Sequence, residues 1–428
     1  MLLMFCSLNF MQQFQWLQYS IIANIIVRFY DVTINDVNWT SVITFVVLIP
    51  IMIPCTWVLE KVGLRNYLII GALFNFIATV IKCMSVNPTL FWVTLLGQAF
   101  NGISVPFIQP LSAQIARTWF PKDKISRATG IGVFSMFIGS MLSSLIPVLL
   151  VPNSDNKEEI AIGLSRMFIA QAVFAAIQII CILIYFEEEP PTPPSKAESS
   201  AYSVRRSESY FQSMKRVLNI NLILILFVYA ICGSESNSFL TVLNQMILQH
   251  FKKDEKLVGI IGFLANGGSM MSTFVIGLIL DKYKCYKQLI FICYSVSCCL
   301  FIILAITIHV QSITLLMMVA TILGFTINSY PTIIFNFASE LTYPEPEGVS
   351  SSLCVLTSQI LSTIATFVVS RLILYYGVLA ANLYYSAMLV FAMILAAFVK
   401  SDLRRERTEN ETEIIDTESD VTSYGTYA

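Results

Sequence analysis

The chain has 428 residues, a formal net charge of −1 and a mean hydropathy of +0.73. Hydrophobic residues make up 56% of it and charged residues only 12%, about half the charged fraction of a soluble globular domain. These values exclude a soluble globule, and the near-zero net charge offers no basic surface for a nucleic acid.

Most of the sequence consists of apolar blocks long enough for a helix to cross a bilayer. Because lipid provides no hydrogen-bond partner for an open backbone, each block is expected to be helical. The sequence therefore predicts an all-α membrane protein with twelve transmembrane helices. The predicted spans are 2–29, 39–59, 66–86, 89–116, 127–151, 162–186, 220–249, 257–280, 288–309, 312–339, 349–375 and 379–400.

The first predicted span carries a stripe of polar residues on one helical face. Such a stripe either borders a cavity or hydrogen-bonds to neighbouring helices, and we favour the cavity. The eleventh span repeats the pattern. The stripes contain Asn9, Gln12, Gln13, Trp16, Tyr19, Ser20 and Asn24 in the first span, and Ser352, Gln359, Ser362, Thr363 and Thr366 in the eleventh.

Trp16 is the strongest candidate for binding an organic cation. A quaternary ammonium has no hydrogen-bond donor on its nitrogen, so the negative face of an aromatic ring holds it best. Phe45 and Phe137 could complete an aromatic cage, and the alternative for each is simple packing.

Residues 187–219 form the longest connection and mix four prolines with serines and charges, without an apolar period. We predict a disordered cytosolic linker there, between an N-terminal six-helix half (1–186) and a C-terminal half (220–400), with a disordered tail at 401–428. Lys and Arg concentrate in the connections on the side of the linker, so both termini are expected in the cytosol. No cleavable signal peptide is evident, and the plasma membrane is the expected location.

Glu235 is the one carboxylate expected deep in a span, and no Lys or Arg is expected deep in the first seven spans. An ionisable group in hydrocarbon is costly and suggests function. Glu235 would either pair with a cationic substrate or stay protonated as a structural group. Because no chain of acids or histidines accompanies it, facilitated diffusion is favoured over proton coupling.

Other chemistry is weakly supported by the sequence. The ten cysteines are scattered without a metal-binding spacing, and the isolated His250 and His309 are poor candidates for haem ligation, so no metal or cofactor is expected. No phosphate-binding loop for ATP and no nucleophilic triad appears, so the chain is not expected to be an enzyme. Asn38-Trp39-Thr40 is a glycosylation sequon, but its closeness to the membrane disfavours its use.

Polar turns recur between the second and third span of each half, as Trp57-x-x-Glu60-Lys61-x-Gly63-x-Arg65 and Gly277-x-x-x-Asp281-Lys282-x-x-x-x-Lys287. These turns resemble the loop motif of the major facilitator superfamily, and a structural role as a clasp between helices is expected for them.

Further segments resemble the feline leukaemia virus subgroup C receptor family of that superfamily. They are Phe14-Gln-Trp-Leu-Gln-Tyr19, Leu59-Glu-Lys-Val-Gly-Leu-Arg65, Trp119-Phe120, Val148-Leu-Leu-Val-Pro152, Pro193-Pro-Ser-Lys-Ala197, Glu340-Leu-Thr-Tyr-Pro-Glu-Pro-Glu-Gly348 and Ser401-Asp-Leu-Arg-Arg405. The resemblance implies a facilitator of choline and ethanolamine, and haem export for some members.

The same resemblance places Gln359 at a binding position of the family. The chain departs from the family elsewhere: Asn237 stands where members usually have Tyr, Phe137 where they have Gln, Asn336 where they have Glu, and Gln114 where they have Arg.

The predicted function is therefore alternating-access transport of a small organic cation, choline or ethanolamine, by a monomer embedded in lipid. The expected substrate-binding residues are Gln12, Trp16, Tyr19, Phe45, Phe137, Glu235, Asn237 and Gln359. The alternatives are a haem exporter and a receptor that has the transporter fold but does not transport.

Overall fold

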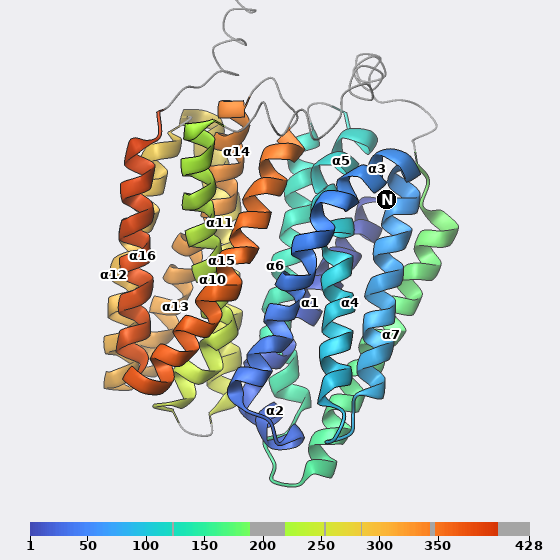
Figure 1. Ribbon diagram of the computed structural model, residues 1–428, viewed down its shortest axis with the longest axis vertical. Coiled ribbons are helices and arrows are strands. Elements are labelled where there is room, and N and C mark those ends of the chain that lie inside the picture. The colour runs from blue at the N-terminus through green and yellow to red at the C-terminus, as the bar shows by residue number, and fades with distance from the viewer. Residues whose placement is uncertain (122–123, 189–218, 252–253, 284, 343–346, 401–428) are drawn as a thin grey trace, which may run out of the picture.

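The computed structural model describes residues 1–121, 124–188, 219–251, 254–283, 285–342 and 347–400, and the described elements are α-helices (Figure 1). All twelve predicted spans are found as helical segments in the predicted order. Most of the predicted linker and the whole predicted tail lie outside the described residues, as do the resemblance segments 193–197 and 401–405.

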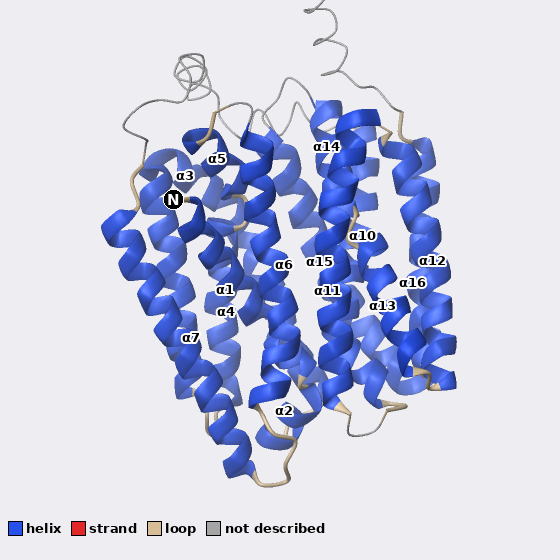
Figure 2. Cartoon of the chain, turned by 180° about the vertical axis from the view of Figure 1, so that it is seen from behind, coloured by secondary structure: helices blue, strands red, loops and turns tan. Residues whose placement is uncertain are grey.

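The helices before the linker gather on one side of the molecule and those after it on the other (Figures 1 and 2). The first group comprises α1 (Leu2–Ile21), α2 (Ala23–Tyr30), α3 (Ile34–Met84), α4 (Phe91–Ile108), α5 (Leu111–Trp119), α6 (Ile125–Leu150) and α7 (Lys157–Tyr185). The second comprises α10 (Ile220–Leu248), α11 (Glu255–Tyr283), α12 (Tyr286–Val310), α13 (Ile313–Ile327), α14 (Tyr330–Thr342), α15 (Glu347–Tyr376) and α16 (Val378–Phe398).

Among the described residues, eleven helical segments are long and apolar enough to cross a membrane. The first predicted span is not one of them. It is split at Ile22 into α1 and α2, and its glutamines and asparagines lower its hydropathy. Most of these polar side chains are buried. A helix that is this polar is stable in a membrane only when protein surrounds it.

The fourth and tenth predicted spans are each interrupted, whereas the sequence had suggested continuous helices. The fourth becomes α4 and α5, which meet at Gln109 and Pro110, and the tenth becomes α13 and α14, which meet at Asn328 and Ser329. Pro110 supplies no backbone donor and cannot continue the helix. Pro331 stands in the first turn of α14, where a missing donor costs nothing. The two halves thus carry the same kind of break at the matching helix.

The repeated polar turns have matching partners in the two groups. In α3, Gly63 has a φ of 77°, which a residue with a side chain rarely adopts, and this break lets the helix reverse between two spans. Arg65 then donates to the Leu183 carbonyl at the end of α7 (3.0 Å). Lys287 donates to the Val399 carbonyl just beyond α16 (2.7 Å). Each basic side chain therefore caps the negative end of the last helix of its group.

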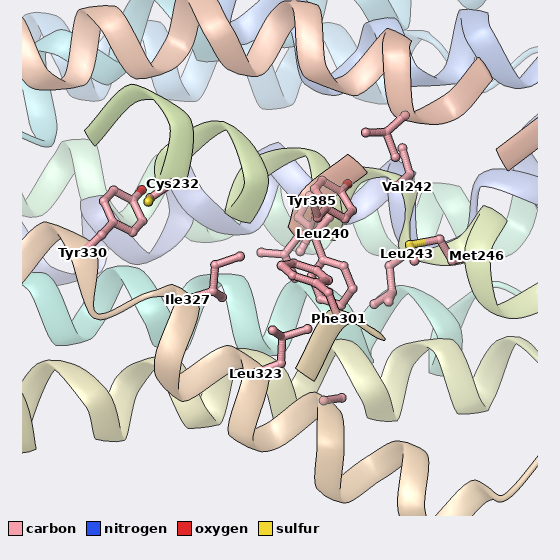
Figure 3. Close-up of a cluster of buried hydrophobic side chains, with 14 of the residues drawn as sticks. Cys232, Leu240, Val242, Leu243, Met246, Phe301, Leu323, Ile327, Tyr330 and Tyr385 are labelled. Carbon is pink, nitrogen blue, oxygen red and sulfur yellow. The ribbon is translucent and has the colours of Figure 1, made fainter. Parts of the chain in front are cut away.

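Three helix pairs make the most extensive contacts between the two groups: α6 with α11, α3 with α15, and α1 with α10. Inside the second group, α10 packs against α12, α13 and α16 through a cluster of large apolar side chains (Figure 3). In it, Phe301 stacks on Tyr385 with ring centroids 4.7 Å apart. The faces of α1, α3, α10 and α15 that remain between the groups carry the candidate site.

Candidate functional site

Trp16 and Phe45 form an aromatic pair between α1 and α3. Their ring centroids are 5.7 Å apart and their planes are inclined by 47°. Only 7% of Trp16 is exposed, and its indole Nε1 has no hydrogen-bond partner among the described residues. An indole N–H usually finds a partner when it is buried, so this donor is available to a ligand.

Asn237 and Gln359 form a polar pair between α10 and α15. Asn237 Nδ2 lies 3.0 Å from Ser362 Oγ and 3.5 Å from Gln359 Oε1. The structure therefore brings together Asn237, one of the four departures from the family pattern, and Gln359, which the resemblance places at a binding position. Neither side chain is fully buried.

The aromatic pair and the polar pair lie at similar depth. Near one end of the interface, Asn244 of α10 donates to the Ile21 carbonyl of α1 (2.7 Å), which fixes the register of these two helices. At 1.5 Å of rise per residue, Asn237 lies about 10.5 Å back along α10 and Trp16 about 7.5 Å back along α1. Both helices start at the linker end, so the two residues differ in height by about 3 Å. We call Trp16, Phe45, Asn237 and Gln359 the aromatic–amide cluster.

Gln12 and Tyr19 are held inside the first group of helices. Gln12 Oε1 accepts a hydrogen bond from Gln109 Nε2 (3.2 Å). The Tyr19 ring packs against Phe168 of α7 at 5.8 Å. Within the stripe, Gln12 and Tyr19 therefore join helices, whereas Trp16 pairs with Phe45.

Phe137 is buried in α6, but the described residues show no ring contact between it and the Trp16–Phe45 pair. The expected three-membered aromatic cage is therefore not assembled in this structure.

Glu235 is also separate from the cluster. It lies two residues from Asn237 on α10, which turns it by about 200° to the opposite face. Ser238, three residues after Glu235 and on the same side of α10, bonds to the Tyr385 hydroxyl of α16 (3.1 Å). Glu235 is 1% exposed, and neither carboxyl oxygen has a hydrogen-bond partner among the described residues. An ionised carboxylate without partners is very costly in such a place, so the neutral carboxyl is the favoured form.

Lys82 corrects the expectation that no basic residue is buried in the first seven spans. It stands in the last turn of α3, yet it is 0% exposed and its Nζ donates to Gln15 Oε1 (2.9 Å). Its aliphatic stem fits against Gly97 of α4, where an added Cβ would lie 2.8 Å from the Lys82 Cγ. The ammonium also lies 5.9 Å from the centroid of the Tyr19 ring. The position of Lys82 near the end of a span does not suggest burial from the sequence alone. Helical side chains point back toward the N-terminus of their helix, and the Lys82 side chain thereby reaches Gln15, the neighbour of Trp16.

Amide side chains tie the two groups together at the α2 end. The Glu255 Oε1 atom of α11 accepts from Asn24 Nδ2 (2.7 Å) and from Asn153 Nδ2 (2.8 Å). Asn244 Nδ2 donates to Asn24 Oδ1 (2.9 Å). The interface is therefore closed by hydrogen bonds at this end, beyond the aromatic–amide cluster.

A second set of bonds at the same end involves the sequon. Asn38 is 1% exposed, donates to Ser370 Oγ of α15 (2.9 Å) and accepts from Gln245 Nε2 of α10 (2.8 Å). Its amide is fully engaged between helices, so an oligosaccharide cannot be attached to it in this conformation.

The Major Facilitator Superfamily profile matches residues 4–366. The choline/ethanolamine transporter flvcr2a of Danio rerio is 36% identical over 413 residues, which cover 96% of this chain and 88% of the relative. FLVCR2 of Homo sapiens, a choline/ethanolamine transporter by name, is 32% identical over 96% of this chain and 78% of the relative. FLVCR1 of Felis catus, named likewise, is 34% identical over 94% of this chain and 73% of the relative.

Among solved structures, a D-xylose-proton symporter aligns with a TM-score of 0.73 at 14% identity, covering 94% of this chain and 98% of the other. A bacterial homologue of the lysosomal transporter Spinster, in an inward-facing and unoccupied conformation, aligns with a TM-score of 0.68 at 14% identity, covering 93% and 95%. These two likenesses concern the fold alone. Together with the sequence relatives, they show that the chain is a multi-pass membrane transporter of the major facilitator superfamily and belongs to the feline leukaemia virus subgroup C receptor family.

Proposed function

We propose that this transporter moves choline or ethanolamine by facilitative alternating access, at the plasma membrane and with both termini in the cytosol. The names of the relatives support the substrate class. The observation that carries the proposal is the aromatic–amide cluster, in which a buried indole and a phenyl ring lie at the depth of two amide side chains from the opposite group.

This combination suits a small cation with a hydroxyl group. The ring face attracts an ammonium without requiring a donor on its nitrogen, and desolvation strengthens that attraction to about 2 kcal/mol. Asn237 and Gln359 offer both amide donors and acceptors to a hydroxyl. The two pairs belong to different groups of helices, so a cation held by both would link the two groups.

The hydrogen bonds at the α2 end support alternating access. A substrate at the cluster can leave in that direction only if the bonds of Glu255 and Asn38 break. These are mostly amide bonds, each worth about 0.5–1.5 kcal/mol net, so a modest free energy can open them. Facilitative transport is supported by the isolation of Glu235, which among the described residues has no acidic or histidine neighbour in hydrogen-bond contact to relay a proton.

The test is flux of radiolabelled choline, ethanolamine and haem in cells that express the chain, compared with cells carrying an empty vector. Choline or ethanolamine uptake that follows its own concentration gradient and is unchanged by a proton ionophore is expected. Flux of haem alone would favour the exporter alternative. Binding of any of the three without flux would favour the receptor.

Replacing Gln359 with alanine should weaken the apparent affinity for choline several-fold, because one hydrogen bond to the substrate typically contributes about 0.5–1.5 kcal/mol. The measurement is the concentration dependence of initial uptake. Gln249→Ala serves as the matched control, since Gln249 is exposed at the end of α10. If the parent and Gln359→Ala reach half-maximal uptake at the same choline concentration, Gln359 does not contact the substrate.

Replacing Glu235 with glutamine should leave choline transport nearly unchanged at both mildly acidic and mildly alkaline pH. Glutamine reproduces the shape of a neutral carboxyl, and Glu235 faces away from Asn237. The measurement is choline uptake by Glu235→Gln and the parent at several pH values, with the exposed Glu158→Gln as control. A sharp loss of cation transport in Glu235→Gln would instead support an ionised Glu235 that pairs with the substrate.

A further inference from the structure

A cleft of about 330 Å³ opens on the outer surface where the end of α6 meets the first turns of α7. Its apolar lining includes Leu149 and Leu150, and its polar lining consists of Glu159 and Arg166. Gly163 makes this meeting possible, because a Cβ there would lie 2.6 Å from the Leu150 carbonyl oxygen. The cleft lies outside the interface that holds the aromatic–amide cluster.

Arg166 is a charged residue that lies next to a stripe of exposed apolar side chains on α7. Along α7 the exposed side chains on this face are Ile162, Ile169, Val173, Ile177, Ile180 and Ile184. These residues belong to a predicted membrane span, so the face is expected to contact lipid. Arg166 is exposed among them and forms no ion pair or hydrogen bond with any residue that the structure describes. A charge facing lipid without a protein partner is expensive, so it is expected to reach a lipid headgroup.

The depth of Arg166 matches the lower part of a headgroup. With 29 residues, α7 is about 43 Å long, which exceeds the hydrocarbon thickness of about 30 Å and leaves about 7 Å at each end. Arg166 lies about 13.5 Å from the first residue of α7. Its backbone is therefore about 7 Å inside the hydrocarbon boundary, a depth from which a long arginine side chain can extend to that boundary.

Glu159 stands seven residues earlier, on the same face of α7 and about 10.5 Å nearer the membrane surface. From the surface inward, the face thus presents a carboxylate, then a guanidinium, then a stripe of isoleucine and valine. A zwitterionic phospholipid presents an ammonium, then a phosphate, then acyl chains in the same order. We propose that this cleft binds one phosphatidylcholine or phosphatidylethanolamine molecule of the adjacent leaflet.

In this site Arg166 binds the phosphate, because the planar guanidinium matches its oxygens in a bidentate way. Glu159 attracts the ammonium, and the aliphatic stripe of α7 receives an acyl chain. An anionic phospholipid without an ammonium would bring its negative headgroup close to Glu159. The site therefore selects the zwitterionic lipid over the anionic one.

The test is native mass spectrometry of the purified full-length protein in detergent, titrated with palmitoyl-oleoyl phosphatidylcholine or with phosphatidylglycerol of the same acyl chains. The parent should retain phosphatidylcholine at lower lipid concentration. Arg166→Gln should weaken retention of phosphatidylcholine about tenfold, which corresponds to losing a charge-assisted hydrogen bond. Glu159→Gln should abolish the preference for phosphatidylcholine. Arg371→Gln is the matched control, because Arg371 is exposed on α15 and has no carboxylate within the neighbouring turns of that helix.

Equal retention of both lipids by the parent would overturn the proposal, and so would equal losses in Arg166→Gln and Arg371→Gln. Thermal unfolding without added lipid provides the check on folding, since the midpoints of Arg166→Gln and the parent should coincide. The readout does not use transport, so this proposal and the proposed substrate can fail separately.

Discussion

Replacing Trp16 with alanine is expected to abolish uptake of choline or ethanolamine while the amount of protein at the cell surface stays unchanged. The indole supplies the larger of the two aromatic faces in the cluster, and its contact with Phe45 at 5.7 Å would be lost as well. Losing a desolvated cation–π interaction of about 2 kcal/mol alone reduces binding roughly 30-fold. Trp16 is the member of the aromatic pair that belongs to α1, so the substrate would also lose its aromatic contact with that helix.

Trp16→Phe separates the role of the ring face from that of side-chain volume. Phenylalanine keeps a weaker quadrupole and removes the unpartnered Nε1 donor, so partial uptake with reduced affinity is expected. Trp92→Ala is the matched control, because Trp92 is 62% exposed on α4 and should tolerate the change. Initial uptake normalised to surface protein is the measurement, and full activity of Trp16→Ala would refute the proposed site.

Replacing Gly324 with alanine is expected to destabilise the second group of helices strongly. A Cβ at Gly324 of α13 would overlap the carbonyl oxygen of Ala265 in α11, and a Cβ at Gly268 of α11 would overlap the Thr321 carbonyl in α13. The two backbones therefore approach each other through small residues, as membrane helices commonly do. Both obstacles are backbone atoms, which cannot rotate away as a side chain can.

The expected cost of this overpacking is about 1–3 kcal/mol, because the two helices must move apart to admit the extra methyl group. Thermal unfolding of the purified protein, together with its yield after detergent extraction, would show the effect. Gly130→Ala is the control, because an added Cβ there has no atom within 4 Å and replaces a helical glycine by a better helix former. Equal unfolding midpoints for Gly324→Ala and Gly130→Ala would contradict the close packing of α11 and α13.

The sequence alone was sufficient for the class of the protein and for the order of its helices. Apolar length and the exclusion of open backbone from lipid determine both, without any knowledge of the packing. The sequence also made Trp16 a candidate for the site, because a polar and aromatic stripe in a span must face protein or substrate. The tertiary structure pairs Trp16 with Phe45, and Asn237 with Gln359, on opposite groups of helices.

The direction in which each polar side chain points was decided only by the tertiary structure. Tyr19 belongs to the same stripe as Trp16 but packs against Phe168. Glu235 is two residues from Asn237 but lies on the side of α10 where Ser238 bonds to Tyr385. Lys82 stands near the end of a predicted span and is fully buried, while Asn38 belongs to a sequon and bonds between three helices. Helical periodicity gives the angle between residues on one helix. It does not give the rotation of that helix relative to its neighbours, which depends on the packing of side chains that are distant in sequence.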